Sequence, residues 1–448
     1  MRINMDFKPL KLMQDIAIGV KLNCFQLLIG FSITFILMSC SKKQVEPAHG
    51  EEQAIFELMD SLKTGVLFRN DIVEYDSFNY FYFDEFYEGA GTGIIDVNND
   101  GLQDLFFVSN QGPDKLYLNK GNFQFEDISQ KAGIEGGQEW SNGVTIADVN
   151  GDGFQDIYIS CRLSDILDFR TNRLYINNKD NTFTERAKEY GIDDSGYTAH
   201  ASFFDFDLDG DLDLYVVNQP PNGRLYKIKM TGKTDFQYTD HLFENVNGHF
   251  IDITKKADVT NYDYGLSVMI GDLSNDGYPD IYVANDFDNP DILFLNNQDG
   301  TFKDITSISL KHMSTFSMGG DIADMNDDGW LDLMVMDMVA EDHYRNKTNM
   351  SGMNPKKFWD LVKHGYQYQY MYNSFQLNQG NGLFSEIALM SGVSNTDWSW
   401  TTLLSDFNND GKKDAFITNG LLRDVRNKDF NTKSSQDYQQ HHKIKKLG

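Results

Sequence analysis

Short apolar segments alternate with turns rich in Gly, Asn and Asp over most of the chain. An apolar segment such as Leu105–Val108 is followed by a second such as Leu116–Asn119, and then by a third such as Phe125–Ser129. A fourth segment, as in Val144–Ala147, leads into the next polar loop. Four short strands in a unit of about 50 residues are typical of a β-propeller blade. The pattern therefore predicts an all-β chain of four-stranded blades, which stack around an axis because one blade cannot bury both of its faces.

Each unit carries one copy of a nine-residue polar loop. Six copies are present, and they begin at Asp96, Asp148, Asp205, Asp272, Asp324 and Asp406. Positions 1, 3, 5 and 9 hold carboxylates or amides in nearly every copy, and the glycine at position 6 permits a sharp turn. Calcium takes six to eight oxygen ligands, which side chains at alternate positions of a tight loop can supply. The loops therefore predict calcium sites.

By analogy with other calcium loops, positions 1, 3, 5 and 9 give side-chain oxygens, and position 7 gives its backbone carbonyl. The predicted ligands are Asp96, Asn98, Asp100, Leu102 and Asp104; Asp148, Asn150, Asp152, Phe154 and Asp156; Asp205, Asp207, Asp209, Asp211 and Asp213; Asp272, Ser274, Asp276, Tyr278 and Asp280; Asp324, Asn326, Asp328, Trp330 and Asp332; and Asp406, Asn408, Asp410, Lys412 and Asp414. An EF-hand is excluded because position 12 never holds Glu and the flanking segments are predicted strands. The alternative is a set of metal-free Asp/Asn/Gly hairpin turns, and Ser274 makes the fourth loop the weakest match.

A second pattern appears eight residues before each loop, where five of the six repeats carry an aromatic residue and the first carries Glu88. The predicted ligand-binding residues are these five aromatics and a neighbouring tryptophan: Trp140, Tyr197, Tyr264, Phe316, Trp398 and Trp400. In a propeller they would lie near the axis, on the face opposite the acidic loops, where they could stack on sugar rings or hold a peptide. The alternative is equivalent packing between blades, which repeated units produce automatically.

Composition narrows the classes of function. The 448 residues carry a formal net charge of −28, and 21 of the carboxylates lie in the six loops. Such a surface repels phosphate, so nucleic-acid binding is not expected. Cys161 is the one cysteine beyond the N-terminal 40 residues, so we expect a small buried side chain and no internal disulfide. Sequence patterns of common catalytic sites are absent, and we predict a protein that is not an enzyme.

The N-terminal segment predicts targeting to the cell envelope. Lysines precede an apolar run that ends in Leu-Met-Ser-Cys, with Cys40 last. This resembles a bacterial lipobox, in which the cysteine is lipidated. We therefore expect a signal peptide over 1–39, a polar tether over 40–60, a propeller over 61–430 and a polar tail over 431–448. The alternative for the apolar run is an uncleaved transmembrane anchor, although its 17 residues are at the lower limit for spanning.

Several segments carry a resemblance to a known family, over roughly residues 60–430. They are Asn110–Asn119, Trp140–Gly143, Phe203–Asp213 and Thr396–Trp400. The chain is similar to FG-GAP/VCBS repeat proteins, whose blades carry calcium loops as in the integrin α-subunit propeller. More narrowly, it resembles Bacteroidota surface lipoproteins that join such repeats to a C-terminal ASPIC/UnbV domain. The family pattern continues beyond a sixth loop, so we expect a truncated product or fragment, with six or seven blades. A six-bladed ring could close by pairing the N-terminal β segments, 66–68 and 78–87, with the last strands.

The resemblance and the loops together favour a calcium-stabilised, lipid-anchored binding or adhesion module of the outer membrane, either periplasmic or surface-exposed. Its expected partner is a glycan or an envelope protein. The alternative is a polysaccharide-acting lyase or hydrolase, with the insertion at 339–370 near its active site. This insertion could equally be a surface excursion without function.

Overall fold

The chain divides into two compact units, residues 1–57 and 58–448. The computed structural model describes residues 55–76, 78–80, 86–134, 136–137, 139–162, 169–220, 236–287, 289–349, 354–421, 427–429 and 433. The predicted signal peptide, most of the tether, Cys40 and nearly all of the polar tail therefore lie outside the described residues. All of the sheets belong to the second unit.

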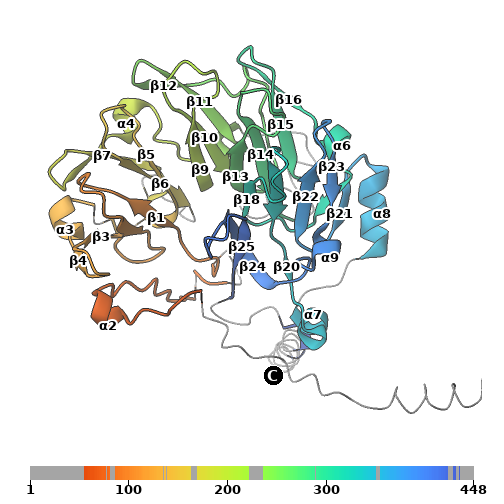
Figure 1. Cartoon of the computed structure of the whole chain (residues 1–448), viewed down its shortest axis with the longest axis horizontal. Coiled ribbons are helices and arrows are strands. Elements are labelled where there is room, and N and C mark those ends of the chain that lie inside the picture. The colour runs from red at the N-terminus through yellow and green to blue at the C-terminus, as the bar shows by residue number, and fades with distance from the viewer. Residues whose placement is uncertain are drawn as a thin grey trace, which may run out of the picture. The chain divides into compact units, whose positions relative to one another are not determined.

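Six antiparallel sheets follow one another along the chain and form the blades of a propeller ring (Figure 1). Blade 1 contains β1 (Thr92–Ile95), β2 (Asp104–Phe107), β3 (Lys115–Asn119) and β4 (Phe125–Asp127). Blade 2 contains β5 (Trp140–Ala147), β6 (Asp156–Arg162), β7 (Arg173–Asn177) and β8 (Phe183–Glu185). Blade 3 contains β9 (Thr198–Phe204), β10 (Asp213–Asn218), β11 (His241–Val246) and β12 (His249–Asp252).

The second half of the ring repeats this plan and ends with a smaller sheet. Blade 4 contains β13 (Gly265–Gly271), β14 (Asp280–Asn285), β15 (Ile292–Asn296) and β16 (Phe302–Asp304). Blade 5 contains β18 (Gly320–Ala323), β19 (Asp332–Val335), β22 (Ser374–Asn378) and β23 (Phe384–Glu386). Blade 6, within the described residues, contains β20 (Met338–Val339), β24 (Asp397–Ser405) and β25 (Asp414–Asn419). The predicted all-β propeller is thus confirmed, with six blades.

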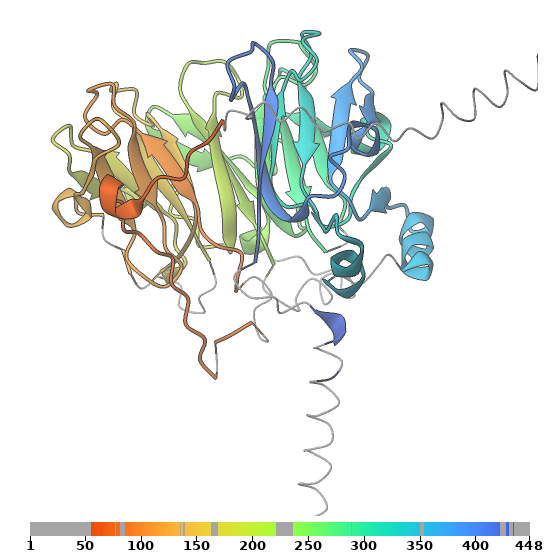
Figure 2. The same ribbon diagram turned by 60° about the horizontal axis from the view of Figure 1, so that its bottom comes forward.

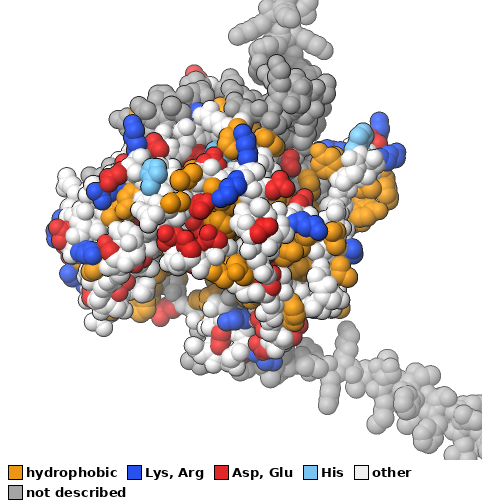
Figure 3. All heavy atoms as spheres, turned by 90° about the horizontal axis from the view of Figure 1, so that it is seen from above, with side chains coloured by type: hydrophobic (Ala, Val, Ile, Leu, Met, Phe, Trp, Pro, Cys, Tyr) orange, Lys and Arg blue, Asp and Glu red, His pale blue; other side chains and the backbone are white. Residues whose placement is uncertain are grey.

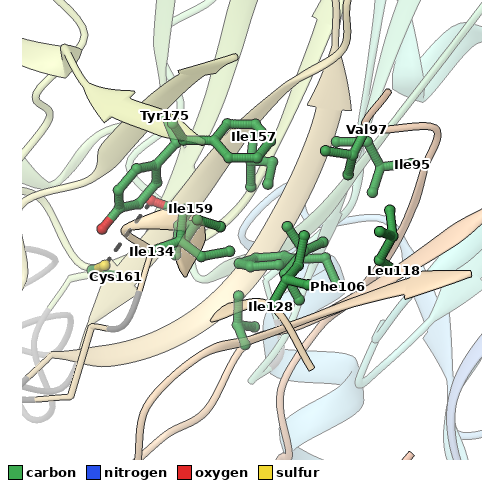
Figure 4. Close-up of a cluster of buried hydrophobic side chains, with 14 residues drawn as sticks. Ile95, Val97, Phe106, Leu118, Ile128, Ile134, Ile157, Ile159, Cys161 and Tyr175 are labelled. Carbon is green, nitrogen blue, oxygen red and sulfur yellow. Dashed lines mark hydrogen bonds between the residues drawn. The ribbon is translucent and has the colours of Figure 1, made fainter. Parts of the chain in front are cut away.

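Hydrophobic clusters fill the joints between neighbouring blades. In β6, Ile157 and Ile159 pack with Phe106 of blade 1, whereas Tyr158 between them packs with Leu214 of blade 3 (Figure 4). Successive residues of a strand point to opposite faces, so a strand in the middle of the ring is buried on both. This explains why the second strands of blades 2 to 5 are buried at every position, and why no blade is expected to fold alone. Cys161 is fully buried in the first of these clusters, as predicted.

Short helices lie between blades or in the insertion. The helices α3 (Ser129–Ala132), α4 (Ala187–Tyr190), α6 (Thr306–Ser309) and α9 (Ala388–Ser391) each follow the fourth strand of a blade. The insertion holds α7 (His343–Asn349) and α8 (Pro355–Lys363), and its strand β21 (Tyr368–Tyr370) pairs in parallel with β17 (His312–Ser314). The described residues also contain α2 (Ser61–Thr64), before blade 1, and the 3₁₀ turn η2 (Phe236–Tyr238). In the described part of the chain, no helix has the length and apolar character needed to cross a membrane.

The segment before β1 packs against blade 1. The ring of Phe68 stacks on Phe107 of β2 at 4.9 Å, and the side chain of Gln124 donates to the carbonyl of Lys63. Within its described residues the segment forms one isolated β-bridge, between Tyr75 and Phe78. Among the described residues, this segment forms no strand pairing with the last strands. Residues 81–85 of the segment lie outside the described residues, so closure of the ring through them stays a prediction.

Candidate functional site

The six acidic loops occupy equivalent places in the six blades. In blades 1 to 5 each loop connects the first strand to the second, and in blade 6 it connects β24 to β25. Position 9 is the first residue of the strand that follows the loop. In blade 2, for example, Ala147 pairs with Asp156 across the hairpin. In the tilted view of Figure 2, connecting loops are seen on both faces of the ring. The predicted strand–loop–strand context is confirmed in all six cases.

Hydrogen bonds within the loops turn their side-chain oxygens inward. In the second loop, Asp148 accepts hydrogen bonds from the amides of Asp152 and Gly153 at 3.0 and 2.8 Å. Asn150 also accepts from the amide of Asp152, and Asp152 accepts from the amide of Phe154, both at 3.0 Å. The same bonds from positions 5, 6 and 7 to the side chains of positions 1 and 5 recur in the other five loops. These shared hydrogen bonds give the six loops the same conformation.

The backbone at positions 4 and 6 has positive φ in every loop. The position-6 residues are all glycine, with φ between 83° at Gly101 and 100° at Gly210. Position 4 is Asn, Asp or Gly except in the third loop, where Leu208 adopts φ 62°. A left-handed conformation is unfavourable for most residues, so its presence at two positions of each loop indicates a specified backbone geometry.

The position-9 carboxylates are buried next to other negative charges. Asp104, Asp156, Asp213, Asp280 and Asp332 have at most 1% of their surface exposed, and Asp414 is half-buried. Burial and the neighbouring carboxylates raise the pKa of Asp156 to about 6 and that of Asp213 to about 7, although two backbone amides donate to each. No ion pair with Lys, Arg or His involves these five groups among the described residues. A buried carboxylate is costly when it is charged and has no positive partner, so a bound cation would stabilise these groups.

The third loop is the most acidic. Oxygen atoms of Asp205, Asp207 and Asp209 lie within 4.8 Å of one another, so this cluster can hold an ion. In addition, Oδ1 of Asp211 is buried without a hydrogen-bond partner, and burial next to Asp209 raises the pKa of Asp211 to about 6. Carboxylate oxygens at this spacing, together with loop geometry, suit a hard divalent cation such as calcium. On the surface of the molecule, acidic side chains lie in groups between hydrophobic ones (Figure 3).

Two loops depart from the common arrangement. In the fourth, the hydroxyl of Ser274 donates to Asp272 at 3.4 Å, so the residue at position 3 is tied to the carboxylate at position 1. In the second, Lys179 lies 3.3 Å from Asp152 and 5.3 Å from the ring of Phe154, and this ammonium group competes with a cation.

An asparagine at the end of the third strand belongs to the same site, and the sequence analysis did not assign it a role. In blade 4, the amide N–H of Asn296 donates to Asp280 Oδ1 at 2.9 Å. Its side-chain Nδ2 donates at 2.8 Å to the carbonyl of Phe206, in the acidic loop of blade 3. Asn177 and Asn378 make the same two bonds in blades 2 and 5. The asparagine that ends the third strand in several repeats was the available signal, and in blades 2, 4 and 5 it links the acidic loop to the loop before it.

The predicted ligand-binding aromatics lie mainly between blades. Trp140, Tyr264 and Trp398 have between 2% and 6% of their surface exposed, whereas Tyr197, Phe316 and Trp400 are half-buried. Trp140 packs edge-on against Phe78 at 5.4 Å, and Tyr264 packs edge-on against Phe287 at 4.8 Å. This burial favours the packing alternative for Trp140, Tyr264 and Trp398, since a ligand needs exposed ring surface.

A cavity of about 420 Å³ lies on the axis of the ring and is lined by the innermost strand, or the residues just before it, in all six blades. Its ionisable lining groups are Glu88 and His200. Arg162 lies 2.9 Å from Glu88 and is itself fully buried, so the carboxylate is ion-paired. Trp400 is the one predicted ligand-binding aromatic among the lining residues.

Comparisons with known proteins agree with this architecture. The FG-GAP-like repeat family matches residues 96–159, 165–216 and 272–335. Cartilage acidic protein 1 of Xenopus tropicalis is 35% identical over 69 residues, and that of Mus musculus is 33% identical over 69 residues. Each match covers 15% of this chain and 11% of the relative, so the chain spans only a small part of either relative's length.

Solved structures with similar folds are remote in sequence. A lectin of Agrocybe aegerita, described as recognising non-reducing terminal N-acetylglucosamine, is 14% identical with a TM-score of 0.34, and the match covers 73% of this chain and 70% of the lectin. The Vibrio cholerae biofilm matrix protein Bap1 is 11% identical with a TM-score of 0.39, covering 71% of this chain and 42% of that one. Similarity at this level does not bear on function.

Proposed function

Because the chain is a β-propeller with FG-GAP-like repeats, we propose that it is a calcium-stabilised binding module that recognises a glycan or another envelope protein. The observation that carries the calcium part is the buried carboxylate at position 9, which is repeated in five blades without a positively charged partner among the described residues. Calcium in each loop would supply that positive charge. The side chains of positions 1, 3, 5 and 9 and the carbonyl of position 7 would hold it.

The position of the loops in the blades would give bound calcium a structural role. Each loop closes a hairpin between two neighbouring strands of a blade, and Asn177, Asn296 and Asn378 tie three of the loops to the preceding blade. A ligand that binds only the folded state stabilises that state. Calcium in these loops would therefore hold the blades in register, and the remaining surface would be free to recognise a partner.

We prefer a binding function to a catalytic one because of the groups that line the axial cavity. Hydrolysis of glycosides commonly uses a pair of carboxylates. The cavity brings one carboxylate, Glu88, and this group is paired with Arg162 at 2.9 Å. A polysaccharide-acting enzyme is therefore kept only as the alternative.

The proposed location is the cell envelope, with a lipid anchor on Cys40. This part of the proposal rests on the N-terminal sequence alone, since Cys40 lies outside the described residues. An acidic module held at a membrane by a lipid would meet glycans and envelope proteins as its first neighbours.

The binding function can be tested by capture. The calcium-loaded chain, immobilised through its C-terminus, is exposed to polysaccharides and to detergent-solubilised envelope proteins, and the retained material is analysed. We expect retention of one class in calcium and its loss after chelation, when the blades loosen. Retention of neither class by a chain that is folded in calcium would contradict the proposed function.

A further inference from the structure

The axial cavity is built from one ring of equivalent residues, five positions before each acidic loop. The ring consists of Gly91, Gly143, His200, Ser267, Gly319 and Thr401, and all six line the cavity. Five of them are small. His200 is the exception, so one imidazole breaks an otherwise repetitive lining.

Packing between blades accounts for the small members. A Cβ atom on Gly143 would lie 2.9 Å from the carbonyl oxygen of Ala199, and one on Gly319 would lie 2.7 Å from that of Trp400. The hydroxyl of Ser267 donates to the carbonyl of Met318 at 2.8 Å. These positions are required to be small or polar because neighbouring inner strands approach closely, and they need no ligand to explain them.

His200 also bonds to the neighbouring inner strand, but that contact uses only one of its two ring nitrogens. Its Nδ1 accepts a hydrogen bond from the amide of Val268 at 3.3 Å, which places the ring proton on Nε2. No hydrogen bond to Nε2 is found among the described residues, and His200 is one of the residues that line the cavity. Burial lowers the pKa of His200 to about 4, so the ring is neutral at physiological pH. Nε2–H of His200 is therefore a neutral donor for which the described residues offer no acceptor.

The other lining groups restrict what can accept that hydrogen bond. Leu266, Met318 and Trp400 give apolar wall, and Glu88 gives a carboxylate already paired with Arg162. An anion would meet a protein of net charge −28 and no unpaired cation in the lining. A purely apolar ligand would leave the Nε2–H without a partner, which is unfavourable in a buried site. A neutral molecule with hydroxyl groups and apolar faces satisfies both the donor and the walls.

We infer that the axial cavity binds one neutral sugar residue, with Nε2–H of His200 donating to a hydroxyl or ring oxygen. The volume of about 420 Å³ lies in the usual range for small-molecule sites, roughly 300–1,000 Å³. This inference rests on the proposed function as a glycan-binding module and names its site. The inferred ligand lies beside the set of cavity-lining residues that includes His200. These residues are three positions along the chain from the aromatic residues that the sequence predicted to bind ligand.

The test uses the full chain with calcium and a panel of neutral methyl glycosides, with binding measured by ligand-observed NMR and by calorimetry. In His200→Asn, the amide oxygen can still accept from the amide of Val268, but no donor remains at the place of Nε2. We expect binding of the preferred glycoside to weaken about tenfold, the usual effect of losing one buried hydrogen bond. In His200→Trp, the indole fills the cavity, and we expect binding to be abolished.

Trp359→Ala is the matched control, because Trp359 is 54% exposed on α8 and does not line the cavity. It should leave glycoside binding unchanged. Should His200→Asn fail to fold, Thr401→Leu narrows the same cavity from another strand and is expected to weaken binding as well. Unchanged binding by the folded His200 variants would overturn the axial site and leave the binding function standing. If the wild type binds none of the glycosides, the cavity holds only water and the inference is wrong, even where polysaccharides are retained in the capture experiment.

Discussion

At the scale of single residues, the third loop differs from the others by an extra carboxylate at position 3. Asp207 stands at position 3 of the third loop, where four other loops have asparagine. Burial and the carboxylates of Asp209 and Asp205 raise the pKa of Asp207. An asparagine at this place keeps the oxygen that accepts from position 5, as Asn150 does at 3.0 Å, and removes one negative charge.

The effect of Asp207→Asn on the free energy of unfolding is therefore expected to differ between the metal-free and the calcium-bound protein. In chelator, the variant should be more stable by about 0.5 kcal/mol, because like-charge repulsion is relieved. In saturating calcium, it should lose that advantage, since a carboxylate ligand has become an amide. Chemical denaturation in both conditions measures this, with the exposed Asp193→Asn as the control. Equal effects of Asp207→Asn in chelator and in calcium would show that the loop holds no cation.

Burial distinguishes aromatic residues that pack between blades from those that lie on the surface. Trp398 is 2% exposed and packs with methionines and Phe375 between blades 5 and 6, whereas Trp359 is 54% exposed. We expect Trp398→Ala to lower the free energy of unfolding by about 3–5 kcal/mol, as for other large-to-small core changes. Trp359→Ala should change it by no more than about 0.5 kcal/mol. Denaturant titration of both variants in calcium measures the two free energies of unfolding. A small loss for Trp398→Ala would contradict the packing role of Trp398.

At the scale of elements, the link between one blade and the next is the side chain of an asparagine. Asn296 bonds the carbonyls of Phe206 in blade 3 and of Pro279 in its own blade. Asn119 occupies the same place in blade 1, but its Nδ2 donates to the carbonyl of Gln103 within that blade. A comparison of Asn296 with Asn119 therefore distinguishes the stabilisation by a hydrogen bond between blades from that by a hydrogen bond within one blade.

Asn296→Ala should destabilise the protein by about 1–3 kcal/mol, because two buried carbonyls lose their donor. Asn119→Ala should have a smaller effect, below about 1 kcal/mol, since its bond is exposed to solvent. Thermal unfolding in calcium measures both. Equal losses in the two variants would contradict a role for these asparagines in joining blades.

At the scale of the whole molecule, buried carboxylates make stability depend on pH and on calcium together. Folding raises the pKa of Asp156 and Asp280 to about 6 and that of Asp213 to about 7, from a usual value near 4. The metal-free folded state thus binds more protons than the unfolded state between about pH 4 and pH 7. Its stability therefore falls as pH rises through this window.

Calcium bound in the proposed sites would take the place of those protons, so the stabilisation by calcium should grow with pH. We expect the difference in melting temperature between calcium and chelator to be small near pH 5 and to increase up to about pH 8. Asp240 and Asp291, buried away from the loops with pKa values of about 7, should give the same pH slope in both conditions. A calcium effect that is independent of pH would argue against binding at the position-9 carboxylates.

The sequence predicted the repeated features of the molecule well, because repetition turns a weak local signal into a strong one. Six loops of the same pattern located the hairpin of each blade, and Asp104 to Asp414 each begin the strand that follows the loop, as expected. Features that occur once were not predictable in this way. The packing of Phe68 on Phe107, the parallel pairing of β17 with β21 and the ion pair of Arg162 with Glu88 all depend on tertiary neighbours.

The functional surface was harder to predict for a related reason. Aromatic residues at a repeated position look alike in sequence whether they pack between blades or face a ligand. The ring lining the axis is made of small residues, which carry little signal, and His200 among them was interpreted as structural. Only the arrangement of the inner strands shows that these residues face a common cavity.

The most direct test of the central claim is thermal unfolding of the chain with chelator and with increasing calcium, followed by far-UV circular dichroism. If the acidic loops bind calcium in the folded state alone, the melting temperature should rise with calcium concentration. Each site would add about 2.7 kcal/mol at a hundredfold excess over its Kd. Magnesium at the same concentration should have a weaker effect, because it requires a smaller and more regular set of ligands. Coincident unfolding curves in chelator and in millimolar calcium would contradict the claim and leave the six loops as metal-free turns.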